Sequence, residues 1–222
     1  EIVAVQQTLK LIIEKRAEWP AQISNGTVMV VEKFFDSPIS LIPAHPSAME
    51  TYSYKLLHGP DFALVTYSAK HCFDFIKGFQ QLLKIFEKDN VPAPLKKVLT
   101  NIAQVINKDQ FAIVDKYKSG DELNNAQKLK LAHFIRHGYK QNILSLVVLY
   151  AQIDAWYGMA AAVQKFELVF PDFVQSNEPV IEATGLYHLL VQEPVAYDVA
   201  LDQKSNFLFL TGANMAGKST FI

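Results

Sequence analysis

The chain has one cysteine, Cys72, among its 222 residues, so no disulfide can form within it. Low cysteine use is typical of proteins that fold in a reducing compartment, because disulfides persist mainly in oxidising ones. Cys72 stands between His71 and Phe73, and we expect a buried thiol without a chemical role. The N-terminus lacks the pattern of a signal peptide. Together these features predict a cytoplasmic protein.

An excess of charge of either sign is also missing. The chain has 21 Lys and Arg residues against 22 Asp and Glu residues, for a formal net charge of −1. Proteins that bind nucleic acid usually carry a basic excess, so such binding here would need a local patch. The most basic run consists of Lys128, Lys130, Arg136 and Lys140, with His133 and His137 between them. We interpret it as a solvated helix face, with contact to phosphates or to a partner as the alternative.

Long apolar runs are scarce, and one stretch, residues 143–163, is long enough to cross a membrane. Asp154 would lie near the middle of that span, where an acidic residue costs about 2.5–3.5 kcal/mol. We therefore predict a long helix, from Gln141 to about Phe166, that is buried among other helices. In this interpretation Asp154 is a buried carboxylate that pairs helices and is not catalytic. No membrane partner is expected.

Apolar side chains are abundant: 50% of the residues are apolar and 12% are aromatic. This composition indicates a folded globular protein with a large core. Through most of the first 170 residues, apolar positions recur every three or four residues, which is the spacing of an amphipathic helix. Helices are predicted over residues 2–16, 73–89, 95–106 and from about 124 to 135.

The segments between these helices are less regular. Residues 28–31 fit either a strand or a short helix, and three prolines between residues 38 and 46 predict irregular structure after them. Residues 116–125 contain the strongest loop signals in the first part of the chain.

The character of the sequence changes at Pro171, after which β-branched residues, prolines and turn signals become more frequent. We predict a mainly α fold with two parts. Residues 1–172 form a multi-helical domain, and residues 173–222 form the first β-strands and the phosphate-binding loop (P-loop) of an α/β domain.

The last residues carry the most specific motif. Residues 207–210 predict a buried parallel strand, and Gly212, Gly217, Lys218 and Ser219 then match the P-loop pattern G-x-x-x-x-G-K-[ST]. The glycines let backbone N–H groups approach phosphate closely, and the lysine adds a positive charge at the β- and γ-phosphates. The serine hydroxyl is a Mg²⁺ ligand in such loops. The sequence therefore predicts a nucleotide-binding protein.

The predicted nucleotide site has nine residues and includes no catalytic group. They are Gly212, Ala213, Asn214, Met215, Ala216, Gly217, Lys218, Ser219 and Thr220, with Ser219 also assigned to the metal. A P-loop enzyme needs an acidic strand and a group that positions water as well. Phe221 and Ile222 follow the loop, so we expect a fragment that does not hydrolyse ATP alone.

The residues within the loop narrow the family. Thr211-Gly-Ala-Asn-Met-Ala-Gly-Lys-Ser-Thr220 resembles the Walker A loop of the MutS family of DNA mismatch repair ATPases. Upstream, Tyr150–Asp154 resembles a segment of that family's last core helix. Three further segments, residues 171–174, 179–182 and 185–188, resemble its passage into the ATPase domain. The resemblance is specific over about residues 145–222 and architectural before that.

This resemblance implies a helical core or lever domain followed by the start of an ATPase domain. It implies that ATP and Mg²⁺ bind at the loop, that mismatched or branched duplex DNA is a partner, and that the ATPase domain forms a homodimer. The helices would couple the nucleotide state to the grip on DNA. The segment between the third predicted helix and the long apolar helix is too short for the family's DNA clamp, so the clamp is expected to be reduced or absent.

Two further residues receive roles at this stage. Tyr197 is a candidate for stacking on the adenine base, and His188 is interpreted as a hydrogen-bonded histidine at a strand end. Two other functions remain open. The chain could belong to a P-loop NTPase of another class, or to a MutS-like scaffold protein that binds little DNA.

Overall fold

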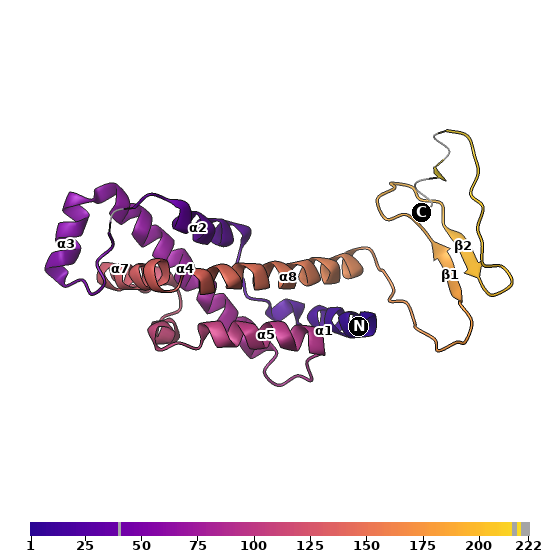
Figure 1. Cartoon of the computed structure of the whole chain (residues 1–222), viewed down its shortest axis with the longest axis horizontal. Coiled ribbons are helices and arrows are strands. Elements are labelled where there is room, and N and C mark those ends of the chain that lie inside the picture. The colour runs from indigo at the N-terminus through magenta and orange to yellow at the C-terminus, as the bar shows by residue number, and fades with distance from the viewer. Residues whose placement is uncertain (40, 215–216, 219–222) are drawn as a thin grey trace. The chain divides into compact units, whose positions relative to one another are not determined.

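The computed structural model describes residues 1–39, 41–214 and 217–218 (Figure 1). The chain divides into a helical unit, Glu1–Gln164, and a C-terminal unit, Lys165–Ile222. The longer helices are α1 (Ile2–Lys15), α2 (Asn25–Asp36), α3 (Ala48–Leu57), α4 (Gly59–Ile85), α5 (Ala93–Ile106), α6 (Ala112–Lys116), α7 (Asn125–His133) and α8 (Lys140–Lys165). Between them lie the short 3-10 helices η1 (Arg16–Glu18), η2 (Asp109–Phe111) and η3 (Gly120–Glu122) and the π-helical segment η4 (Phe134–Gly138). The predicted mainly α composition is confirmed.

Helix α4 is the centre of the helical unit, and α2, α3, α5, α6 and α7 all contact it. Its buried side chains do not form a single stripe. Phe73, Ile76 and Phe79 are fully buried on the predicted stripe, and Phe75 and Leu82 are buried beside it. A helix that is apolar on several sides must be surrounded by other elements to keep those sides out of water. The α4 sequence therefore requires a bundle around it.

The uncertain segment at residues 28–31 belongs to helix α2. Ser24 precedes the helix and accepts a hydrogen bond from the Thr27 N–H at 3.2 Å, which satisfies one of the free donors of the first turn. Val31, Phe34 and Phe35 are buried on one face. The spacing of these residues decides between the two alternatives, because a strand would have placed Phe34 and Phe35 on opposite faces.

Helices α3 and α6 were not predicted. The start of α3 has a capping box, in which the Glu50 N–H donates to the Ser47 hydroxyl and the Ser47 N–H donates to the Glu50 carboxylate. The motif S-x-x-E is readable in the sequence. The apolar residues that follow it do not form a buried stripe, since Met49, Tyr52 and Leu56 are all exposed. This explains why periodicity gave no signal there.

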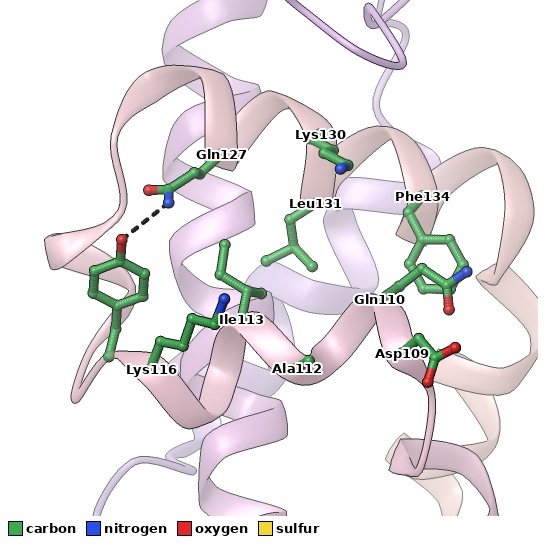
Figure 2. A pocket seen from close by; sticks show the side chains of 10 residues that line it. Asp109, Gln110, Ala112, Ile113, Lys116, Gln127, Lys130, Leu131 and Phe134 are labelled. Atoms are coloured by element: carbon green, nitrogen blue, oxygen red, sulfur yellow. Dashed lines mark hydrogen bonds between the residues drawn. The ribbon is translucent and has the colours of Figure 1, made fainter.

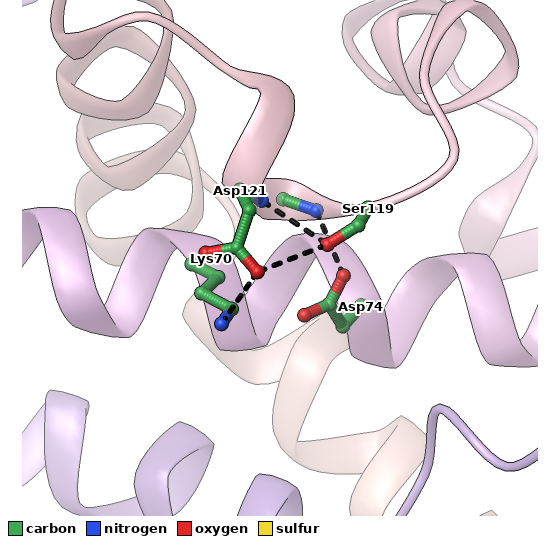
Figure 3. Close-up of polar contacts among 5 residues, drawn as sticks. Lys70, Asp74, Ser119 and Asp121 are labelled. Atoms are coloured by element: carbon green, nitrogen blue, oxygen red, sulfur yellow. Dashed lines mark hydrogen bonds and ion pairs between the residues drawn. The ribbon is translucent and has the colours of Figure 1, made fainter.

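The predicted loop at 116–125 is confirmed as irregular chain around the short turn η3, and it is pinned to the middle of α4 (Figure 3). The Gly120 N–H donates to the Asp74 carboxylate at 2.8 Å, and the Lys70 ammonium contacts the Asp121 carboxylate at 2.7 Å. A Cβ on Gly120 would lie 2.6 Å from the Lys70 carbonyl oxygen. The loop backbone therefore lies directly against the helix backbone.

Helix α8 confirms the predicted long helix but corrects its burial. Its buried residues form one stripe, consisting of Ile143, Leu146, Ile153, Trp156 and Ala160. Val148 is 71% exposed and Met159 is 51% exposed on other faces. Among the described helices, α8 is the one long and apolar enough to cross a membrane by length and composition, and 22% of that apolar window is buried.

The interpretation of Asp154 as a buried, helix-pairing carboxylate is wrong, because Asp154 is exposed. Helix α8 packs through its buried apolar stripe and through aromatic side chains instead. The Tyr150 ring packs edge-on against Phe75 and Phe79 of α4, and the Tyr157 ring lies 4.7 Å from that of Trp19. The apolar run alone could not show which face is buried, since Asp154 lies one position beyond the buried Ile153.

The C-terminal unit contains two antiparallel strands, β1 (Ile181–Leu186) and β2 (Tyr197–Leu201). Residues 207–210, predicted as a buried parallel strand, are not a strand in the structure, and Phe207 and Phe209 are 77% and 76% exposed. A strand needs neighbours for its backbone hydrogen bonds, and no described strand pairs with this segment. A run of four apolar residues does not specify which segment such a strand would pair with.

The close approach at Gly120 yields a stability test. Gly120→Ala should lower the free energy of unfolding by about 1–3 kcal/mol, because the new methyl group would overlap the Lys70 backbone, which cannot rotate away. Gly158→Ala in α8 is the matched control, since its Cβ would have no atom within 4 Å and a helical alanine is favoured by up to about 1 kcal/mol. Urea unfolding followed by circular dichroism measures both variants. An unchanged midpoint for Gly120→Ala would contradict the described packing.

Candidate functional site

The predicted nucleotide loop is described in part. The structure describes Gly212, Ala213, Asn214, Gly217 and Lys218. Four of the predicted site residues, Met215, Ala216, Ser219 and Thr220, lie outside the described residues, and Ser219, the predicted Mg²⁺ ligand, is one of them.

Lys218 folds back over the start of the loop. Its ammonium group donates to the carbonyl oxygen of Gly212 at 2.7 Å and to that of Ala213 at 2.6 Å. A lysine ammonium has three donors, so two of them fix the group against the backbone and the third remains for another acceptor. The arrangement keeps a positive charge next to Gly212 and Ala213. A polyphosphate is a suitable ligand for such a charge.

Gly217 has a left-handed backbone conformation. Its φ angle is +78°, in the left-handed region that residues with a side chain rarely adopt. A Cβ there would have no atom within 4 Å, so the requirement for glycine comes from the backbone angle and not from crowding. The turn places the Lys218 side chain so that it reaches back to Gly212.

A β-bulge lies upstream of the loop, in strand β1. The register of the β1–β2 pairing shifts by one residue between Ala183 and Leu186. Gly185 in the bulge has a φ of +65°, and its N–H donates to the Asp198 carboxylate at 2.8 Å. A glycine within a strand pattern is a bulge signal, but the sequence gave no signal for the role of Asp198. Asp198 is therefore a structural residue that sequence reasoning missed.

The two residues assigned roles before the loop lie around these strands. His188 follows β1, and its Nδ1 atom accepts a hydrogen bond from the Leu190 N–H at 3.2 Å, which confirms the hydrogen-bonded interpretation. Tyr197 begins β2 opposite Leu186. The adenine role of Tyr197 stays a prediction.

The basic run at 128–140 is only partly a solvated face. The Arg136 guanidinium donates to the carbonyl oxygens of Phe34 and Ser37 and lies 5.2 Å from the Phe34 ring. The His133 ring nitrogen Nδ1 lies 2.7 Å from the Ile42 carbonyl oxygen. These groups hold the end of α2 and the following loop against α7 and η4. They are structural, because their donors are used within the fold.

A cavity of about 540 Å³ lies between α6 and α7 (Figure 2). Its floor is apolar, with Ala112, Ile113 and Leu131, and Lys116 and Lys130 stand at its edge. On one side the Gln127 amide donates to the Tyr117 hydroxyl at 3.0 Å. The cavity has the size of a small-ligand site, but its lining has no group arranged for catalysis.

Cys72 is buried as predicted, with 1% of its surface exposed. Burial raises the pKa of its thiol to about 12. The thiolate is the reactive form of cysteine, so at neutral pH the buried thiol of Cys72 is protonated and unreactive. Among the described residues no group of three or more His, Cys, Asp or Glu side chains could hold a metal ion.

Comparison with curated proteins finds several that are similar to this chain and are named DNA mismatch repair protein MutS. The protein of Oleidesulfovibrio alaskensis is 28% identical over 141 residues, which cover 57% of this chain and 15% of that protein. The protein of Leuconostoc mesenteroides is 32% identical over 145 residues, covering 57% of this chain and 16% of that protein. That of Pseudothermotoga lettingae is 35% identical over 88 residues, or 36% of this chain and 10% of that protein.

These matches support a MutS-like relationship. The matched part covers about one sixth of the length of these relatives. Most of each relative therefore has no counterpart in this comparison. No protein-family profile matches the chain, and no solved structure matches it.

The burial of Cys72 gives a direct test. In the folded protein the thiol should react with a disulfide reagent such as DTNB at least about 100-fold more slowly than in 6 M guanidinium chloride, because its thiolate is both rare and inaccessible. Absorbance at pH 8 follows the reaction. Rapid labelling of the native protein would show that the core around α4 opens readily.

Proposed function

We propose that this chain is part of a MutS-like DNA mismatch repair ATPase that binds ATP and Mg²⁺ at residues 212–220. In this proposal the domain boundary lies at 172/173, with the helical domain before it and the start of the ATPase domain after it. The whole protein would bind mismatched or branched duplex DNA and form a homodimer through its ATPase domain.

The main support is the loop itself. Its sequence meets every fixed position of the P-loop pattern, and its described part combines a left-handed Gly217 with a lysine turned back onto Gly212 and Ala213. A curved backbone with a fixed positive charge is suited to a phosphate chain. The similarity to proteins named MutS supports the choice among P-loop proteins.

Helix α8 offers a physical route for coupling. It runs from Lys140 to Lys165 and ends where the C-terminal unit begins. Within the helical unit, its Tyr150 packs on α4, and its Gln164 accepts a hydrogen bond from Arg16 at 2.6 Å. A ligand that orders the loop can act on the bundle through such a rigid helix, provided that it binds two states of the protein unequally. This is the basis of the proposed lever.

A scaffold function with little DNA binding is the second candidate, and the net charge of −1 favours it. The run at 128–140 weakens the case for a DNA-binding face further, because Arg136 is bound within the fold. A P-loop NTPase of another class remains the third.

The nucleotide proposal is tested by Lys218→Ala in the whole protein. ATP affinity should fall by about 100-fold or more, because a charge-assisted contact to phosphate is lost. Lys204→Ala is the control, since Lys204 is an exposed lysine of the same unit outside the loop. Isothermal titration with ATP and Mg²⁺ measures both. An unchanged ATP affinity of Lys218→Ala would show that ATP does not bind at this loop.

The DNA proposal is tested by measuring how DNA affinity depends on salt concentration. Binding of the whole protein to mismatched, branched and perfect duplexes is followed by fluorescence anisotropy between 50 and 200 mM salt. For a phosphate-binding protein, affinity should fall steeply with salt, by about 1,000-fold if six phosphates are contacted. The mismatched or branched duplex should bind more tightly than the perfect one. Binding to none of the duplexes at 50 mM salt would favour the scaffold alternative.

A further inference from the structure

A second cavity, with several lysines in its lining, lies in the helical unit along the N-terminal half of α4. It has a volume of about 560 Å³ and is lined by α3, α4, η3 and α7. Four charged side chains line it: Lys55 of α3, Lys70 of α4, Lys128 of α7 and Asp121 of η3. Three ammonium groups and one carboxylate give the lining a formal charge of +2.

We infer that this cavity binds a phosphate-bearing ligand. Its formal charge of +2 would neutralise a phosphate dianion, and its volume lies within the range of small-ligand sites. The three cations come from three different helices, of which α7 is distant in sequence from α3 and α4, and the fold places all three around one cavity.

The ion pair in Figure 3 fixes one of the three lysines at the edge of this cavity. The Lys70 ammonium contacts Asp121 at 2.7 Å, and η3 is itself held to α4 through Gly120 and Asp74. The hydrogen bond from Lys70, and then the positive charges of Lys70 and Lys128, lower the pKa of Asp121, so this carboxylate stays charged at neutral pH. It positions Lys70 and at the same time weakens the positive field.

The other two lysines are placed differently. The Lys55 ammonium lies 5.8 Å from the centre of the Phe62 ring, at the mouth of the cavity. Lys128 stands on α7, and its neighbour Lys130 lines the other cavity, that of Figure 2. The two lysines of α7 therefore face different cavities, which provides a control on the same helix.

The start of α4 adds a weaker contribution. Gly59 lines the cavity and is the first residue of this 27-residue helix, and no side chain caps the first turn. The positive end of the helix dipole therefore adds to the field of the lysines. Asp61 of the same turn does not line the cavity.

The test uses the full chain carrying Lys218→Ala, so that the proposed P-loop contributes no phosphate binding. A failure of the cavity proposal can then be distinguished from a failure of the nucleotide proposal. The probes are inorganic pyrophosphate, followed by calorimetry, and fluorescein-labelled duplex DNA, followed by anisotropy. In that background Lys55→Gln and Lys128→Gln together should weaken binding of the true ligand class by about tenfold or more. Lys130→Gln should leave it within about twofold.

Asp121→Asn provides a variant with the opposite expectation. Removing the carboxylate should tighten binding by about two- to fivefold, and a folding defect cannot produce that gain. Circular dichroism checks that the lysine variants keep their helices.

The two probes distinguish the source of the phosphate. If DNA binds tightly and its binding depends on Lys55 and Lys128, the ligand is a nucleic-acid backbone. If only the binding of pyrophosphate depends on these lysines, the ligand is a small phosphate compound. Either result supports the site. If neither probe binds, or if Lys130→Gln weakens binding as much as the double variant, the proposal is overturned.

Discussion

The helical unit depends on the burial of α4. Its aromatic and aliphatic side chains are apolar on more than one side, and they can leave water only if other helices surround them. The 27 residues of this helix therefore dictate the positions of α2, α5, α6 and α7 around it. The polar contacts at Lys70, Asp74 and Gly120 act on the same helix, and they fix the loop that separates α6 from α7. Helix α4 thus both supplies the buried core and positions the charged groups at Lys70 and Asp74.

The fold was predictable where periodicity is strong. The stripes at 2–16, 95–106 and 124–135 correspond to helices with buried faces in the structure. Helix α3 could not be found in this way, because its large side chains Met49, Tyr52 and Leu56 point to solvent, and only its capping box marked it. The exposure of Asp154 shows a related limit: in an almost wholly apolar stretch, the sequence does not reveal which face is buried.

The candidate site was predictable in its residue types and less so in its geometry. The motif predicted the residue types, but not the contacts of Lys218 with the carbonyl oxygens of Gly212 and Ala213, because the sequence assigned that lysine to phosphate. The strand predicted before the loop was wrong, because four apolar residues do not specify a partner for their backbone groups. The anchor between Asp198 and Gly185 was missed for a similar reason, since it joins residues 13 positions apart.

In the proposed function, helix α8 connects nucleotide binding in the C-terminal unit to the packed bundle of the helical unit. Hydrogen exchange of the whole protein, with and without ATP and Mg²⁺, tests that connection most directly. We expect slower exchange in peptides that cover residues 207–220, together with altered exchange in α8. Unchanged exchange in the loop would contradict the nucleotide site, and protection of the loop with no change in α8 would contradict the lever.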